Sequence, residues 1–292
     1  INTRMKKDIL IISIIIIGGL FSTGCTREGC TLSCASNYDS KAKKDDFSCR
    51  GCTDPCVANY CPGAIFDDSS CTYDPINLSF TFSHTVGTTT LEFDAIKYTN
   101  ADSNNYSVLT LTYFISDITL HTSSGDTILI DDEHYVDARN NSTLTFSPSQ
   151  KIPNGDYSYI SFTFGLNSNK NITGVYPNAP ENNMEWPSPM GGGYHYMKLE
   201  GKHDSSGTTK NYQAHMGPTM GNDYHIRVTL PSSFTADCNI STYRNANISM
   251  DINKWFETPN TLDLNDLSSI MGDMAMQIEL QQNGADVFTV SI

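Results

Sequence analysis

Basic residues are scarce in this chain of 292 residues, where 18 lysines and arginines stand against 32 aspartates and glutamates. The formal net charge at pH 7 is therefore −14. A nucleic-acid-binding protein needs a basic face that neutralises phosphates and releases counterions. The acidic balance argues against a nucleic-acid partner, although it identifies no other partner by itself.

The sequence also lacks the short motifs of common hydrolases and nucleotide-binding enzymes. It has no GxSxG elbow, no HExxH helix motif and no P-loop. Acidic pairs such as Asp131-Asp132 occur as often on solvated loops as in catalytic sites. We therefore expect a protein that is not an enzyme.

Long hydrophobic runs are missing except near the start, where residues 9–21 form an apolar stretch behind Lys6-Lys7. About a dozen residues suit a signal peptide rather than a spanning helix, and Met5 is the expected translation start. The stretch ends in Ser22-Thr23-Gly24-Cys25, which resembles the bacterial lipoprotein cleavage box with Ser22 in the usual place of Leu.

That resemblance implies a lipoprotein signal peptide over residues 1–24, cleavage after Gly24 and a lipid anchor on Cys25. The alternative is a plain secretory peptide. We expect a tethered rather than spanning protein in the envelope of a Gram-negative-type bacterium, in the periplasm or on the outer membrane.

Residues 29–50 and 51–72 repeat with a period of 22, as GCTLSCASNYDSKAKKDDFSCR over GCTDPCVANYCPGAIFDDSSCT. The repeat resembles the short GCTDP, NY, DDGSC modules that follow the lipid anchor of many bacterial surface proteins. Units this short cannot bury a core, and export permits disulfides. We assign residues 25–74 to this Cys-rich segment and predict disulfides Cys30–Cys49 and Cys52–Cys71. The pairing of the others stays open: Cys34, Cys56, Cys61 and Cys238.

Two metal interpretations of the repeat compete with disulfides. Zinc is disfavoured because residues 25–83 contain no His and the expected compartment is oxidising. Calcium can be considered at Asp45-Asp46 and Asp67-Asp68, although their spacing is not that of an EF-hand loop.

Residues 75–292 change to short segments rich in Thr, Val, Ile, Phe and Tyr, separated by Gly, Asn, Asp and Ser. Their number and length predict an all-β, Greek-key β-sandwich domain. Helix is expected only within residues 262–274, and Trp255 is expected to be a packed aromatic residue. Strands or strand pairs are expected at 78–86, 106–122, 127–137, 142–148, 157–166, 195–203, 224–230, 247–256 and 286–292.

Residues 184–217 gather one Trp, three His and four Met, although the whole chain has only two Trp and seven His. The prolines and glycines of residues 187–193 predict a loop in the first half of this run. Imidazole and thioether donors at this density indicate copper.

The run resembles the MbnP-like copper-binding family, which has a Met-x-Trp loop, then GY with KLEG, then His-x-Gly. The matching positions are Met184, Trp186, Gly193, Tyr194, residues 198–201 and His215-Met216-Gly217. Further matches extend over most of the chain after residue 78: LSFTFSHTVGTTTLEF at 78–93, Tyr98-Thr99-Asn100, LTYFISDITL at 111–120, HYVDA at 134–138, IPNGDYSYISFTFGLN at 152–167, NITG at 171–174, VTLP at 228–231 and KWFETPNTLDL at 254–264.

The resemblance implies copper, as Cu(I) or Cu(II), held by two imidazoles. In some members a kynurenine, made from Trp by a partner di-haem enzyme of the peroxidase type, adds a third contact. His215 and His84 are the first and second choices for ligands, and His195 is the third. His195 has an alternative as a packed residue, on one face of an expected strand with Met197 and Leu199.

Trp186 is the candidate for oxidation, although Ser188 stands where some members carry a second Trp. The thioethers of Met184, Met190, Met216 and Met220 are either supplementary copper contacts or packing residues. The function expected is extracytoplasmic capture or buffering of copper by a lipid-anchored protein. The alternative is a structural or adhesive surface lipoprotein without a metal site.

Overall fold

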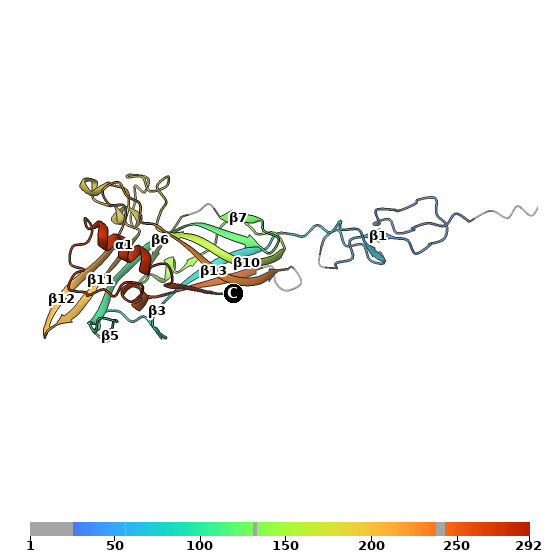
Figure 1. Cartoon of the computed structure of the whole chain (residues 1–292). Coiled ribbons are helices and arrows are strands. Elements are labelled where there is room, and N and C mark those ends of the chain that lie inside the picture. Colours follow the sequence, from blue (N-terminus) through green and yellow to red (C-terminus); the bar gives the residue numbers. More distant parts are fainter. Residues whose placement is uncertain (1–25, 56, 131–132, 238–242) are drawn as a thin grey trace, which may run out of the picture. The chain divides into compact units, whose positions relative to one another are not determined.

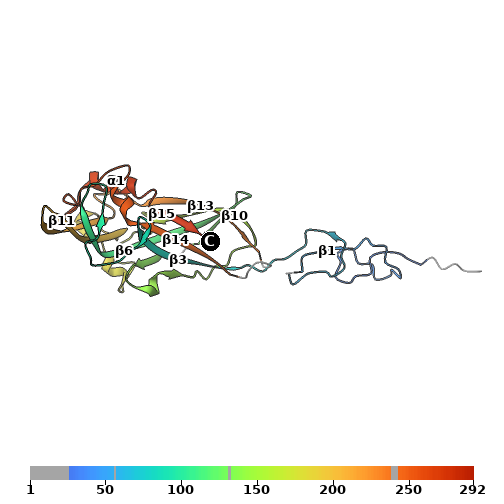
Figure 2. The same ribbon diagram turned by 90° about the horizontal axis from the view of Figure 1, so that it is seen from below.

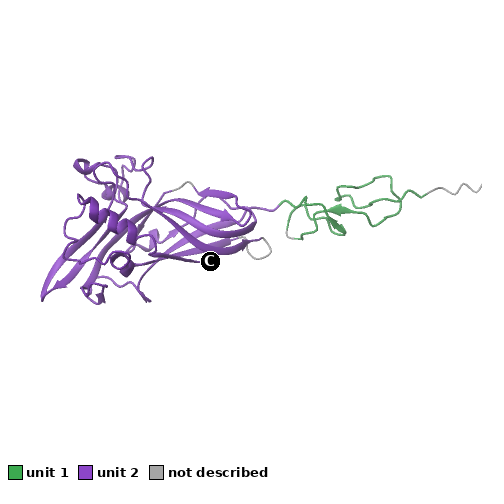
Figure 3. Cartoon of the chain, in the orientation of Figure 1, with its two compact units in different colours: residues 1–72 green, residues 73–292 purple. Residues whose placement is uncertain are grey.

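The computed structural model describes residues 26–55, 57–130, 133–237 and 243–292. The predicted signal peptide, Cys25, Cys56, Asp131-Asp132 and Cys238 lie outside these ranges. The chain divides into two compact units, residues 1–72 and residues 73–292 (Figure 3), and each is considered separately. None of the helices in the described ranges is long and apolar enough to cross a membrane.

The first unit has little regular structure beyond the two-residue parallel strands β1 (Arg50–Gly51) and β2 (Phe66–Asp67). Disulfides Cys30–Cys49 and Cys52–Cys71 confirm the pairing predicted within each repeat. A third disulfide, Cys34–Cys61, joins one repeat to the other. These cross-links constrain a unit whose own hydrophobic cluster is small.

The acidic pairs of the repeat close turns. A side-chain oxygen of Asp45 accepts from the backbone N–H of Phe47, and Asp46 accepts from Ser48. Asp67 and Asp68 make the same bonds in the second repeat, to Ser69 and Ser70. Asx-turns of this kind give these recurring residues a structural role.

The second unit consists mainly of two packed sheets and confirms the all-β prediction (Figures 1 and 2). The larger sheet has the order β12 (Thr208–Met216), β11 (Met197–Ser205), β6 (Asn105–Thr122), β10 (Gly155–Phe164) and β13 (Ile226–Ala236), with β5 (Tyr98–Thr99), β7 (Thr127–Ile130) and β8 (His134–Asp137) also paired to β6. The smaller sheet has the order β15 (Phe288–Ser291), β14 (Tyr243–Asp251), β3 (Asn77–Val86) and β4 (Thr89–Thr90), with β9 (Thr145–Phe146) paired to β3.

A single large core fills the space between the two sheets. The rings of Phe162 and Phe164 in β10 lie 5.2 and 5.3 Å from that of Phe288 in β15, measured between centroids. Trp255 is fully buried beside Phe164, as expected for a packed aromatic residue. Pairing is antiparallel except for β3 with β14, which are parallel within this unit's sheets.

Several local predictions were wrong. The helix α1 (Met274–Asn283) starts where the expected helix ended, because Asp273 caps it by accepting from the N–H groups of Ala275 and Met276. Residues 142–148 form the short 3-10 helix η1 (Asn141–Thr143) and β9 rather than one strand, and η4 (Ile252–Phe256) replaces the end of the strand expected to reach Phe256. Strand β12 was not expected, because polar Thr, Lys, Asn and Gln dominate its sequence.

Candidate metal centre

Residues 184–195, which we call the Trp186 loop, precede β11, and they fold back so that Trp186 lies beside His195. The Trp186 N–H donates to the carbonyl of Gly193 at 2.8 Å, and the His195 N–H donates to the carbonyl of Met184 at 2.6 Å. Between the paired segments lie η3 (Ser188–Met190) and three glycines with positive φ; η2 (Glu181–Met184) precedes them. The Trp186 and His195 rings are 4.6 Å apart and nearly perpendicular.

Residues 171–174, the NITG segment, hold this loop in place. The side-chain oxygen of Asn171 accepts from the Tyr194 N–H at 2.6 Å, and its amide nitrogen donates to the Tyr194 carbonyl at 3.2 Å. The hydroxyl of Thr173 accepts from the Gly193 N–H at 2.7 Å. Gly193 has a φ of 83°, and a Cβ there would lie 2.6 Å from the Asn171 side-chain oxygen. Glycine at position 193 is therefore a requirement of this contact.

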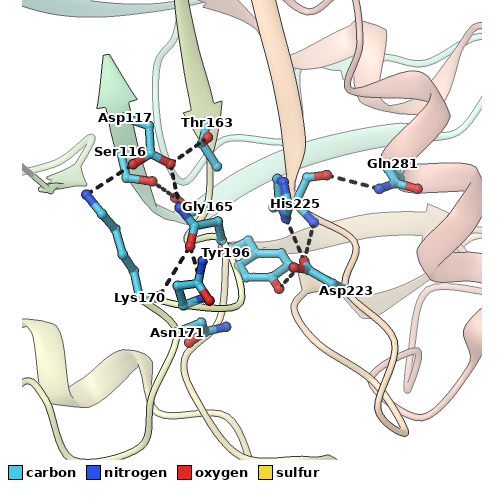
Figure 4. Close-up of polar contacts among 12 residues, drawn as sticks. Ser116, Asp117, Thr163, Gly165, Lys170, Asn171, Tyr196, Asp223, His225 and Gln281 are labelled. Carbon is cyan, nitrogen blue, oxygen red and sulfur yellow. Dashed lines mark hydrogen bonds and ion pairs between the residues drawn. The ribbon is translucent and has the colours of Figure 1, made fainter. Parts of the chain in front are cut away.

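Asp117 anchors the segment that contains Asn171 to the large sheet (Figure 4). Its carboxylate accepts from the Thr163 hydroxyl at 2.9 Å and the Asn167 amide at 2.8 Å, and it pairs with Lys170 at 3.0 Å. These partners hold the pKa of Asp117 below its usual value although burial opposes them. A charged anchor thus connects β6, through residues 167–173, to the Trp186 loop.

His215 reaches the same place from the end of β12. It lies directly opposite Lys198 in the β11–β12 ladder, and Glu200 lies on the same face of β11. The Nε2 atom of His215 lies 2.7 Å from a Glu200 carboxylate oxygen. The His195 and His215 rings are 5.0 Å apart between centroids and nearly perpendicular.

The hydrogen bonds fix which nitrogen of each imidazole carries the proton. Nδ1 of His195 lies 2.9 Å from the Met184 carbonyl, which can only accept, so this nitrogen donates. Nε2 of His215 lies against a carboxylate oxygen of Glu200, and an ionised carboxylate can only accept, so this nitrogen donates. The lone pairs available to a ligand are therefore those on Nε2 of His195 and Nδ1 of His215.

Both of these nitrogens are buried and have no hydrogen-bond partner among the described residues, and the same holds for Nε1 of Trp186. A buried polar atom without a partner costs free energy, so such atoms gathered in one place indicate a ligand. Burial lowers the pKa of His195 to about 3, aided by the charge of Lys198, so its imidazole is neutral near pH 7. Imidazoles oriented by a carbonyl and a carboxylate are well suited to bind copper.

His84 does not join the other two histidines. Its Nε2 bonds the hydroxyl of Tyr113 at 3.0 Å inside the sandwich. Tyr113 pairs with Met197, whereas His215 pairs with Lys198, the next residue along β11. Because neighbouring residues of a strand point to opposite faces, the large sheet separates His84 from His215. His195 is the histidine that lies beside His215, because β11 begins only at Met197 and leaves His195 outside the strand.

The methionines and Trp186 differ in their surroundings. The sulfur of Met184 accepts from the Thr112 hydroxyl at 3.2 Å, and Met216 is buried in the core. Met220 is 58% exposed, and Met190 is half-buried. Trp186 is completely buried beside His195.

The centre is a pair of imidazoles rather than a larger ligand cluster. Within residues 26–292, apart from the positions left undescribed, no group of three or more His, Cys, Asp or Glu side chains is arranged to hold a metal. Glu200 orients His215, and its place in the KLEG match was a signal for a role that the sequence interpretation did not assign. The Met184 carbonyl gave no such signal, because a backbone group is not visible in sequence.

Comparisons with known proteins agree with this fold. A family model described as MbnP matches residues 75–272. The solved structure of MbnP from Methylosinus trichosporium is similar with a TM-score of 0.50 and 14% sequence identity, over 75% of this chain and 98% of that chain. At this identity the structural similarity shows the fold alone. No curated protein matches the chain in sequence.

Proposed function

The chain belongs to the copper-associated MbnP family, and we propose that it binds copper between Nε2 of His195 and Nδ1 of His215. The observation that carries this proposal is the pair of buried lone pairs without partners. Each imidazole is already oriented by its other nitrogen, so binding requires little reorganisation. Leaving these two buried nitrogens without partners is unfavourable, and a bound copper would satisfy both with coordinate bonds.

The surroundings favour capture or buffering of copper over turnover. His195 and His215 are 4% and 8% exposed, and the sulfur of Met184 is bonded to Thr112. Two imidazole donors in a buried setting suit Cu(I), and they also bind Cu(II). A substrate would need open coordination positions and access, so we propose a binding protein rather than an enzyme.

Trp186 is the proposed site of an oxidation that would add a donor to the copper site. Its ring contacts His195, and its Nε1 has no partner among the described residues. We propose that an envelope di-haem enzyme of the peroxidase type oxidises Trp186 to kynurenine, which would offer a further donor to copper. The intact mass of the protein purified from its native host, with peptide mapping of residues 178–198, tests this modification.

The proposed place of action is the cell envelope. The support is the signal-peptide pattern before Cys25 and the three disulfides of the first unit, which an oxidising compartment permits. Metabolic labelling with a radioactive fatty acid, compared between the wild type and Cys25→Ser, tests the lipid anchor.

The test of copper binding is an anaerobic Cu(I) titration of the chain against a chelator competitor. We expect one tightly bound copper, lost in His195→Gln and in His215→Gln. His84→Gln is the matched control, because this histidine is also buried but lies on the other side of the sheet, and it should bind as the wild type does. A wild type without affinity for copper would contradict the proposal and favour a structural or adhesive lipoprotein.

A further inference from the structure

The helix α1 places two glutamines one turn apart against the segment that follows His215. Gln277 is fully buried, and its amide nitrogen donates to the His215 carbonyl at 2.8 Å and to the Ile270 carbonyl at 3.3 Å. Its side-chain oxygen accepts from the Gly217 N–H at 3.1 Å. One side chain therefore bonds the backbone on both sides of Met216.

These bonds complete the outer edge of the large sheet. Strand β12 is the edge strand, and its Gln213 N–H donates to the Leu267 carbonyl. Further along the same edge, the His215 carbonyl and the Gly217 N–H meet Gln277 instead of another strand. A carboxamide has the same donor and acceptor as a peptide group, so Gln277 takes the place of a neighbouring strand at this point.

The same contact defines where Trp186 lies. A Cβ added to Gly217 would lie 2.4 Å from Cε3 of Trp186, so the indole ring packs directly on the Gly217 backbone. Because Gln277 holds both the His215 carbonyl and the Gly217 N–H, it fixes one copper ligand and the surface beneath the tryptophan together.

Gln281 holds the other end of the same connection, residues 217–225 (Figure 4). Its amide nitrogen donates to the His225 carbonyl at 3.0 Å. His225 in turn bonds Asp223 at 2.8 Å through Nδ1, and Asp223 accepts from the Tyr196 hydroxyl at 2.7 Å. Helix α1 thus braces both ends of the segment, although it lies beyond residue 272, where the family model ends.

We propose that Gln277 is the positioning residue of the metal centre, which sets the place of His215 and Trp186 without touching the metal. This inference rests on the proposed copper site. It predicts that replacing the amide leaves both imidazoles present but displaces His215 from His195 and Glu200.

Asn283 supplies a matched control on the same helix. It is also fully buried, and its amide nitrogen donates to the carbonyls of Trp255 and Asn260 at 2.9 and 2.7 Å. Its side-chain oxygen accepts from the Asn260 N–H at 2.9 Å. Asn283 therefore holds the backbone of η4 and of the turn after it through its amide, as Gln277 holds the backbone of β12.

The experiment compares the wild type with Gln277→Met and Asn283→Leu, two replacements of similar size that remove the amide. Three quantities are measured: urea stability without copper, Cu(I) affinity, and the electron paramagnetic resonance spectrum with Cu(II). Both variants should lose stability. Only Gln277→Met should bind copper at least tenfold more weakly and change the Cu(II) spectrum.

Equal losses of affinity in both variants, or a wild-type affinity and spectrum in Gln277→Met, would overturn the inference. If Gln277→Met does not fold, Gln277→Glu keeps the size and the acceptor for Gly217 while losing the donor to His215, and it is judged by the same criteria. Nitrogen NMR of the copper-free imidazoles supplies a readout without metal, in which the His215 resonances should move and those of His84 should not. A wild type that binds no copper overturns the proposed function. In that case the imidazole resonances alone test whether Gln277 positions His215.

Discussion

The buried histidines of this protein differ in how their ring nitrogens are bonded. His84 and His195 are both buried, and burial lowers the pKa of each, to about 4 and about 3. The Nε2 atom of His84 bonds Tyr113, whereas the Nε2 atom of His195 has no partner in the described part of the chain. Burial alone therefore does not identify a ligand. A nitrogen without a partner does not do so either, because both ring nitrogens of the buried His203 lack one among the described residues. The candidate centre is distinguished by two such imidazoles lying side by side, those of His195 and His215.

His84 should make copper-free protein sensitive to acid. Its pKa is about 4 in the folded protein and near the ordinary histidine value of 6.5 in the unfolded chain, so between these values only the unfolded chain binds the proton. Its contribution to stability is complete above pH 6.5 and is lost as pH falls, at up to about 1.4 kcal/mol per pH unit. We expect His84→Gln to flatten the urea stability profile between pH 6.5 and 4. An unchanged slope would show that His84 is not neutral when folded.

At the level of elements, the proposed metal centre is held together by side chains that are not themselves proposed ligands. Asn171 and Thr173 hold the Trp186 loop, and Gln277 holds the end of β12. The Trp186 loop has no regular ladder of its own to define its conformation, and the end of β12 is paired with another strand, β11, on one side only. The geometry of the two imidazoles therefore depends on side chains distant from them in sequence.

Asn171→Ala tests this dependence. It leaves the N–H and carbonyl of Tyr194 without the side chain that bonds them, which should cost about 1–3 kcal/mol of stability and weaken Cu(I) binding. Asn100→Ala is the control, because Asn100 also bonds one backbone N–H and one carbonyl, those of Asn104 and Leu262. Both should be less stable by urea unfolding, and only Asn171→Ala should lose copper affinity. Equal affinity in the two variants would contradict a role for the NITG segment in the centre.

The strands with clear apolar patterns could be predicted from sequence, and the elements held by tertiary contacts could not. Strands β3, β6 and β10 lie where their Val, Ile, Phe and Tyr patterns indicated. Strand β12 has a polar sequence and is a strand because β11 pairs with it and Gln277 covers its edge. The position of His84 could not be predicted either. It bonds Tyr113 on the face of the large sheet opposite to His215, and the strand register that decides this is not encoded in the motif around His84.

At the scale of the whole molecule, the two units are stabilised by different forces. The first depends on three disulfides, and the second on one large apolar core. Every residue of the proposed centre and its supports belongs to the second unit. Copper binding should therefore be independent of the disulfides.

The double variant Cys34→Ser, Cys61→Ser tests this independence. Removing the disulfide that joins the repeats should cost the first unit about 3 kcal/mol of stability. Limited proteolysis should then cleave within residues 26–72 sooner than in the wild type, while the Cu(I) affinity is retained. A matching loss of copper affinity would mean that the first unit contributes to the centre.

The central claim is that one copper lies between Nε2 of His195 and Nδ1 of His215. The most direct measurement is a crystal structure of the copper-loaded protein with anomalous data collected on either side of the copper edge. We expect an anomalous peak within bonding distance of these two nitrogens, with the hydrogen bonds to the Met184 carbonyl and the Glu200 carboxylate retained. A peak at His84 or at the exposed Met220, or imidazoles bound through their other nitrogens, would contradict it.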